Sequence, residues 1–206
     1  METGTSPQRR QFQGSCHCGA VKYAVYLTVP RPARAAAAAL ESPPADRIYR
    51  CNCRICHKSG FMHVRPPVPA SDFALLSPTD PFASLGDYQC HDELLHFFFC
   101  RTCGVRCFIF MGDGHVVDTR PGEFGLGGGG EAAVKKVWRP RGAQASANVK
   151  QAGCYLSVNG HTIDPGQQGF DMREWVERES VMYYDFLQDE DAGPGRYGKP
   201  YPGGCY

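Results

Sequence analysis

Cysteines gathered in three short motifs constrain this chain more than any other feature of its sequence. The chain has 206 residues and 11 cysteines. Seven of them lie in a C-x-C motif at Cys16 and Cys18, a C-x-C-x-x-C motif at Cys51, Cys53 and Cys56, and a C-x-x-C motif at Cys100 and Cys103. At about 5% of the residues, cysteine is too sparse for a disulfide scaffold. Metal binding or thiol chemistry is the better explanation of the clusters.

The chemistry expected of clustered cysteines depends on the cellular compartment. Residues 1–15 are polar and lack the apolar stretch of a secretory signal, and no stretch approaches 18 apolar residues, as a membrane span requires. We therefore expect a cytoplasmic protein without a membrane partner, in which thiols stay reduced. The formal net charge of +1 argues against nucleic acid as a partner.

The first and third motifs together provide four thiols. Tetrahedral zinc with Zn–S bonds of about 2.3 Å places its sulfurs roughly 3.8 Å apart. Residues i and i+2 of an extended segment point the same way, and a C-x-x-C turn brings its two thiols together, with Gly104 able to close the turn at positive φ. We predict a closed four-thiol zinc site from Cys16, Cys18, Cys100 and Cys103. Unrelated buried thiols, a redox C-x-x-C pair and an iron site are the alternatives.

The middle motif provides three thiols within six residues. Three protein ligands leave a fourth tetrahedral position for water or substrate, as is typical of catalytic zinc. The alternative is a second structural site whose fourth ligand is one of Cys107, Cys90, His57 or His63. The spacing alone leaves both interpretations open. Cys154 and Cys205 have no partner at metal-binding spacing.

The remaining sequence predicts a mainly β domain of short strands. Glycine and proline together make up 40 of the 206 residues, which favours short strands and turns over long helices. Strands are predicted at 20–27, 47–51, 61–64, 73–76, 95–99, 106–111 and 115–118, with a hairpin at 155–158 and 161–163 and a short helix at 171–179. We expect a flexible leader (1–12), a single zinc-binding domain (13–188) with loop insertions at 28–46 and 121–150, and a C-terminal tail (189–206).

Three segments resemble the glutathione-dependent formaldehyde-activating enzyme family, which also includes the centromere protein V domain. They are GSCHCGAVKY (14–23), RCNCRICHKSG (50–60) and FFCRTCGVRCF (98–108), and together they span about half of the chain. The segments YLSVN…DPGQQGFDMREW and PGGCY look similar to fungal members. The resemblance implies a β-tent zinc-binding fold of coiled antiparallel strands.

Carried over by position, the resemblance implies two zinc ions per chain. The structural zinc of the family falls on Cys16, Cys18, Cys100 and Cys103, and its catalytic zinc falls on Cys51, Cys53 and Cys56. The implied activity is that of a carbon–sulfur lyase, which adds glutathione to formaldehyde to form S-(hydroxymethyl)glutathione. The sequence departs from simpler members of the family at the insertion 28–46, at the glycine-rich stretch GLGGGG within 121–150, and at Cys107. These differences leave the identity of the substrate open.

Several side chains near the motifs are candidates for contact with a substrate. Arg54, Lys58 and Arg101 are cations that could hold an anionic thiol such as glutathione, although solvated surface cations are the alternative. His57 could move a proton. His17 stands between two ligands of a C-x-C motif, where its side chain should point away from the metal.

Two further functions are compatible with the sequence. Fungal relatives suggest a lyase or isomerase of secondary metabolism on the same scaffold. The centromere protein V relatives suggest a non-enzymatic zinc module that binds protein, a role that a long basic extension would favour. The basic residues of the segment 1–12 are just Arg9 and Arg10, so the sequence favours an enzyme.

Overall fold

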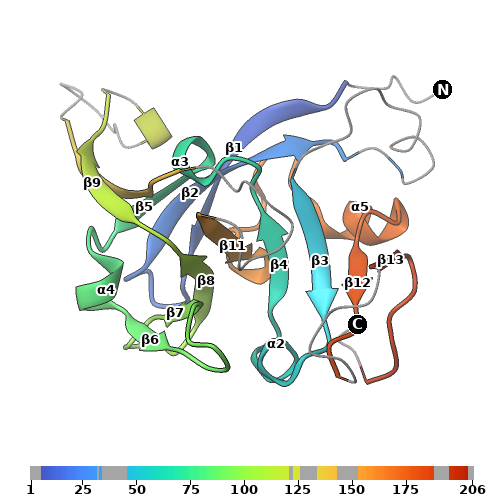
Figure 1. The fold of residues 1–206 in the computed structure, drawn as a ribbon. Helices are drawn as coiled ribbons and strands as arrows, with labels where there is room; N and C mark the ends of the chain where they lie inside the picture. The colour runs from blue at the N-terminus through green and yellow to red at the C-terminus, as the bar shows by residue number, and fades with distance from the viewer. Residues whose placement is uncertain are drawn as a thin grey trace.

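The computed structural model describes residues 6–31, 33, 46–120, 123–125, 134–142, 153–187 and 195–203 (Figure 1). Short strands dominate these ranges, which confirms the predicted mainly β fold with a short C-terminal helix. No helix in them combines the length and the apolar character that crossing a membrane requires.

The strands form two sheets. The five-stranded sheet has the order β1 (Gln8–Ser15), β2 (Lys22–Val29), β5 (Phe73–Ser77), β10 (Lys136–Pro140) and β9 (Gly114–Asp118). The eight-stranded sheet has the order β13 (Arg196–Tyr197), β12 (Met182–Tyr184), β3 (Arg47–Cys51), β4 (Met62–Arg65), β11 (Tyr155–Asn159), β8 (Arg106–Met111), β7 (His96–Phe99) and β6 (Gly86–Tyr88). Neighbouring strands are antiparallel except for β12 and β3, which are parallel.

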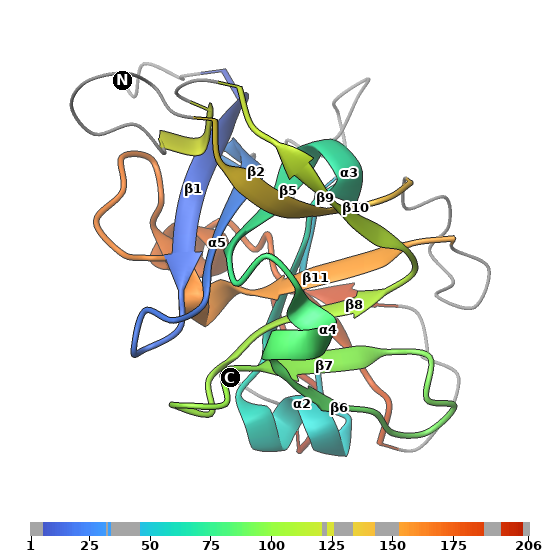
Figure 2. The same ribbon diagram turned by 90° about the vertical axis from the view of Figure 1, so that its left-hand side faces the viewer.

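Short helices lie in the connections between these strands (Figure 2). They are α2 (Arg54–Ser59), α3 (Pro69–Asp72), α4 (Pro81–Ser84) and α5 (Met172–Glu177), with 3-10 turns η1 (Glu123–Gly125) and η3 (Gly160–Thr162). The predicted C-terminal helix corresponds to α5. Its N-cap is Asp171, whose side chain accepts a hydrogen bond from the backbone N–H of Arg173 at 2.9 Å.

Aromatic side chains join the two sheets across the main core. Phe73 of β5 lies 5.3 Å from Phe108 of β8, and Trp138 of β10 lies 5.0 Å from Phe110 of β8, measured between ring centroids. All four side chains are buried. Burying such rings removes a large apolar area from water, so these contacts hold one sheet against the other.

Five predictions about the ends of the domain and its internal segments need correction. The leader predicted at 1–12 is wrong for residues 8–12, which belong to β1, where Phe12 enters the core. The insertion at 28–46 begins too early, because β2 continues to Val29. The loop predicted at 121–150 contains β10, because Val137 and Trp138 are buried.

Two corrections concern the C-terminal part of the chain. The second hairpin strand predicted at 161–163 is mostly the turn η3, and the predicted tail contains the strand β13. Residues 34–45 and Cys205 lie outside the described residues.

Gly14 sits where β1 passes beneath a buried tyrosine. A Cβ atom there would lie 2.2 Å from the ring of Tyr23 and 2.6 Å from the carbonyl oxygen of Thr162. Tyr23 cannot easily move aside, because it is fully buried and its hydroxyl pairs with the Thr162 hydroxyl at 2.8 Å. The close approach of these groups therefore requires glycine.

Gly14→Ala should lower the free energy of unfolding by about 1–3 kcal/mol, the usual cost of forcing an extra carbon into a packed core. Denaturant melts would measure the loss. Gly153→Ala is the matched control, because nothing lies within 4 Å of its added Cβ. Similar melts for the two variants would contradict the close packing at Gly14.

Candidate metal centres

Two groups of cysteines bring their sulfur atoms together in the described part of the chain. Within each group all sulfurs lie within 4.8 Å of one another. The first group, called here the four-thiol group, is Cys16, Cys18, Cys100 and Cys103; the second, the three-thiol group, is Cys51, Cys53 and Cys56. These are the two sets expected from the spacing of the motifs, and each could hold a metal ion.

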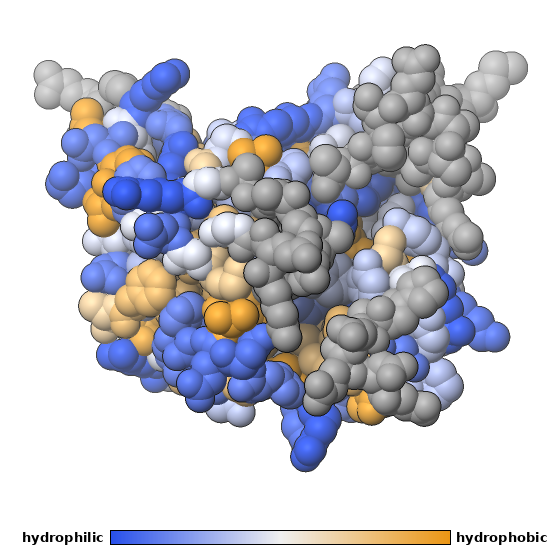
Figure 3. Space-filling view, in the orientation of Figure 1, coloured by the Kyte–Doolittle hydropathy of each residue, from blue (hydrophilic) through white to orange (hydrophobic). Residues whose placement is uncertain are grey.

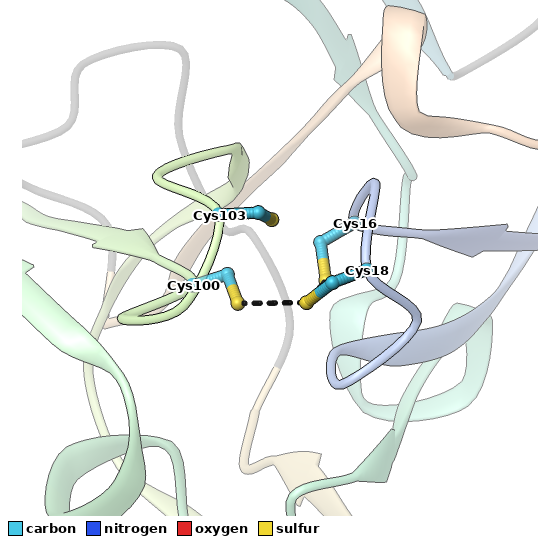
Figure 4. A group of neighbouring side chains, drawn as sticks. All are labelled: Cys16, Cys18, Cys100 and Cys103. Atoms are coloured by element: carbon cyan, nitrogen blue, oxygen red, sulfur yellow. Dashed lines mark hydrogen bonds between the residues drawn. The ribbon is translucent and has the colours of Figure 1, made fainter.

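The four-thiol group joins the two sheets. Cys16 and Cys18 lie in the turn between β1 and β2, whereas Cys100 and Cys103 lie in the turn between β7 and β8. Figure 4 shows the two turns facing each other with their sulfurs directed inward. The Cys18 sulfur is 3.5 Å from the sulfurs of both Cys16 and Cys100, close to the spacing of roughly 3.8 Å in a tetrahedral zinc–thiolate site.

The two turns of this group have closely similar backbones. In the first, the N–H of Cys16 donates to the carbonyl of Val21 at 3.0 Å, and in the second the N–H of Cys100 donates to the carbonyl of Val105 at 3.0 Å. Gly19 and Gly104 each follow the second cysteine, and both have a φ of 74°. Left-handed backbone at this point favours glycine and turns each chain back over its thiols.

Backbone donors favour negative charge on some of these sulfurs. The N–H of Val105 and further hydrogen bonds lower the pKa of Cys103 to about 6. At Cys18 the backbone near Ala20 acts in the same direction, but the neighbouring sulfurs of Cys100 and Cys16 outweigh it and raise the pKa to about 12. Binding of a metal cation by these sulfurs would release the protons that the thiols still carry.

The three-thiol group comes from one continuous segment of the chain, where β3 ends and α2 begins. Cys51 ends β3, Cys53 precedes the first residue of α2, and Cys56 lies within α2. The N–H of Cys53 donates to the Cys51 sulfur at 3.3 Å. Cys51 and Cys56 are buried, whereas Cys53 is half-buried. The group thus lies just below the surface at the base of α2, at the lower end of β3 and β4 in Figure 1.

Hydrogen bonds among the three thiols separate their pKa values. The thiols of Cys51 and Cys56 hydrogen-bond to the Cys53 sulfur and lower its pKa to about 2. The same bond to Cys53 raises the pKa of Cys51 to about 12, and bonds to both neighbours raise that of Cys56. Of the three thiols, Cys53 is therefore the one that its neighbours help most to lose its proton.

A separate small core surrounds the three-thiol group. Its buried members besides Cys51 and Cys56 are Tyr49, Phe61, Phe97, Ile109 and Tyr155. Tyr49 and Tyr155 share a hydrogen bond between their hydroxyls at 2.8 Å. These side chains exclude water from one side of the cluster.

None of the proposed fourth ligands belongs to the three-thiol group in the described residues. Cys107 is buried beside the four-thiol group instead, where burial and the charges of Cys16 and Cys100 raise its pKa. Cys90 packs at the edge of the small core; burial and the charge at Cys53 raise its pKa. His57 is exposed on α2. His63 contacts Cys56 but lies outside the group.

The candidate substrate residues are divided between the two groups. Arg54, His57 and Lys58 are exposed on α2 beside the three-thiol group, where Figure 3 shows a hydrophilic surface at the lower end of the molecule. Arg101 is exposed in the turn of the four-thiol group. His17 is exposed, as expected for the central residue of a C-x-C motif.

Arg106 on β8 lies near the small core, a position not predicted from the sequence. Its guanidinium lies 5.4 Å from the centroid of the Tyr88 ring and 6.0 Å from that of Phe97. Its charge lowers the pKa of Cys90 against the effects of burial and of Cys53, which places it near the edge of the small core. One of its terminal nitrogens, Nη1, is buried without a hydrogen-bond partner among the described residues. It stands beside Cys107 within the segment 98–108, but the spacing of the cysteines gives no sign of its position.

Tyr49 and Ser157 likewise had no predicted role at the site. Strand alternation could have revealed Tyr49, because it stands two residues before Cys51 on β3 and therefore shares its face. Ser157 is brought in by β11, about one hundred residues later. It contacts His63 with 3.0 Å between the Ser157 hydroxyl and Nδ1 of the ring. Burial lowers the pKa of His63 to about 3, so the ring is neutral at physiological pH.

Comparison with known proteins leaves the family of this chain open. No protein-family model matches the sequence. A crystal structure of a Rhodobacter sphaeroides protein is similar with a TM-score of 0.40 and 20% sequence identity, over 79% of this chain and 93% of that one. Similarity at this level assigns no activity, and function has to follow from the two cysteine groups and their surroundings.

Proposed function

We propose that this chain is a zinc-dependent carbon–sulfur lyase that joins a small thiol, such as glutathione, to a small carbonyl compound such as formaldehyde. The observation that carries the proposal is the three-thiol group, which has three ligands and no fourth among the described histidine, cysteine and acidic residues. A site of this composition leaves one metal position for a reactant. The resemblance of the three motifs to the formaldehyde-activating enzymes agrees with this chemistry.

The donor set suits zinc. Three sulfurs within 4.8 Å of one another form a soft site of the kind that selects Zn²⁺ or Cu⁺ over hard cations. Cys51, Cys53 and Cys56 would hold the ion, which when bound supplies Lewis acidity and a position at which a thiol loses its proton. The four-thiol group would hold a second, structural zinc, whose coordination is complete without a reactant.

The surrounding residues have separable roles in the proposed reaction. The addition forms a carbon–sulfur bond, and the proton of the thiol finally resides on the former carbonyl oxygen. Tyr49 and Tyr155 keep water away from the buried side of the cluster. His57, exposed on the adjacent helix, is the candidate that moves the proton. Arg54, Lys58 and Arg106 are candidate cations to hold the carboxylates of glutathione.

Purified protein should contain two zinc ions per chain, because seven clustered thiols exceed the four that one tetrahedral ion can use. Elemental analysis would measure the metal content. Cys51→Ser should remove one of the two ions and leave the other. A single tightly bound zinc that persists in Cys51→Ser would contradict the two-site interpretation.

Glutathione should bind at the three-thiol group, because a free thiol can occupy the fourth metal position. Calorimetric titration of the zinc-loaded protein should detect binding at millimolar glutathione or below, and binding at least about tenfold weaker for S-methylglutathione, which cannot form a thiolate; a tenfold difference corresponds to about 1.4 kcal/mol.

Two results of the same titration would contradict the predicted binding of glutathione. If the second zinc is present and glutathione does not bind, the thiol substrate of the proposal is wrong. If glutathione binds but S-methylglutathione binds equally well, the ligand is held by its carboxylates and the fourth metal position is not used. Turnover with glutathione and formaldehyde, followed by the loss of free thiol, tests the reaction itself.

A further inference from the structure

His63 bridges the three-thiol group and the neighbouring strand β11. Its Nε2 lies 3.1 Å from the Cys56 sulfur, and its Nδ1 lies 3.0 Å from the Ser157 hydroxyl. The residue is 4% exposed. One imidazole therefore connects a candidate metal ligand on α2 to a hydroxyl that is far away in the sequence.

Two aromatic neighbours restrict the plane of the ring. The Tyr49 ring lies parallel to it, with centroids 4.3 Å apart and an interplanar angle of 7°. The Phe61 ring packs against it at a tilt, with centroids 4.7 Å apart and an interplanar angle of 55°. Turning over a buried ring held in this way would require both neighbours to move, so the packing favours the orientation in which Nε2 faces Cys56.

Hydrogen-bonding capacity determines the direction of both contacts once a metal is bound. A metal-bound thiolate has no proton and can only accept a hydrogen bond. A neutral imidazole has one donor and one acceptor nitrogen. If Nε2 carries the proton and donates to Cys56, then Nδ1 is the acceptor, and the Ser157 hydroxyl donates to it.

We propose that His63 is a positioning residue that donates a hydrogen bond from Nε2 to the metal-bound thiolate of Cys56, and that Ser157 fixes the tautomer needed for this. The proposal rests on the proposed function in one respect, namely that the three-thiol group holds a metal. Hydrogen bonds to groups around a metal orient its ligands and tune its electronic properties. The His63 donor would withdraw electron density from Cys56.

The hydrogen bond from His63 would change how readily the Cys56 thiolate reacts with an electrophilic substrate. A zinc-bound thiolate of the protein is itself a nucleophile and would compete with a substrate thiol for a carbonyl carbon. The Cys51 sulfur accepts a backbone N–H from Cys53 at 3.3 Å, whereas the donor to Cys56 is a side chain and can be changed by mutation. His63 would make Cys56 the poorer nucleophile and leave the reaction to the substrate.

The test uses the full chain loaded with ¹¹³Cd, which gives one resonance for each thiolate site. His63→Phe keeps an aromatic ring against Tyr49 but removes the donor. It should move the resonance of the three-thiol site and leave that of the four-thiol site in place as an internal reference. Tyr49→Phe is the matched control. It keeps the stacked ring and removes a hydroxyl that hydrogen-bonds to Tyr155 rather than to Cys56.

The wild-type protein gives an independent readout. Its ¹⁵N imidazole shifts should show protonation at Nε2 alone, with coupling between that proton and the cadmium of the three-thiol site. Protonation at Nδ1, an unmoved resonance in His63→Phe, or the large one-bond coupling of a nitrogen ligated directly to cadmium would each overturn the proposal. So would the absence of a second cadmium resonance. Because none of these measurements requires turnover, a protein that shows the predicted signals but does not act on thiols would retain this role for His63 and lose the proposed function.

Discussion

Cys100→Ser should leave the chain unable to reach a stable fold. The four-thiol group is the direct link between the turn of β1 and β2 in one sheet and the turn of β7 and β8 in the other. A structural zinc in small peptides contributes about 10–16 kcal/mol of apparent binding free energy, which is comparable to or above the whole stability of a domain, about 5–15 kcal/mol. Circular dichroism and thermal melts should show an insoluble protein or one without a cooperative transition.

Cys107→Ala is the matched control for this variant. Cys107 is buried beside the four-thiol group but is not a member of it. Its loss leaves a small cavity and should lower the free energy of unfolding by about 1–2 kcal/mol while the metal is retained. A Cys100→Ser protein that melts like Cys107→Ala would show that the four-thiol group does not hold the sheets together through a metal.

Cys53→Ser should have the opposite profile, with a nearly normal fold and lost activity. The three thiols come from a single segment of six residues, so their metal does not join distant parts of the chain. We expect a small decrease in melting temperature, the loss of one metal ion per chain, and a turnover with glutathione and formaldehyde that is lower by at least about 100-fold, since even residues around a metal's ligands account for 10–100-fold.

Cys90→Ser is the control for Cys53→Ser, because Cys90 packs against the same small core outside the three-thiol group. It should keep both metal ions and most of the turnover. Loss of the second metal from Cys90→Ser would identify Cys90 as a fourth ligand and would remove the open position. Equal collapse of Cys53→Ser and Cys100→Ser would make both groups structural.

The sequence predicted the cysteine groups well because their local spacing already meets the geometric needs of a tetrahedral metal. It also predicted most strands, since alternation and turn residues are local signals. It failed at β10, where the surrounding glycines and polar residues concealed that Val137 and Trp138 are buried against other strands. It failed at 8–12 for the same reason, because pairing with β2 rather than local composition orders β1.

The surroundings of the three-thiol group were harder to predict than its ligands. His63 reaches Cys56 through the pairing of β3 with β4, and Ser157 reaches His63 through the pairing of β4 with β11. Such neighbours depend on sheet order, which spacing along one segment does not encode. Arg106 likewise acquires its position from the rings of β6 and β7.

The wide separation of the four-thiol ligands has a consequence for synthesis on the ribosome. Cys18 and Cys100 are 82 residues apart, and at roughly 5–20 residues per second the first pair of thiols waits about 4–16 s for the second. The three-thiol group is complete within six residues, so it can capture a metal ion while the N-terminal pair still lacks its partners. If both groups hold zinc as proposed, Cys16 and Cys18 would remain without their partner thiols during that interval, and maturation of the chain would depend on the metal supply at the time of translation.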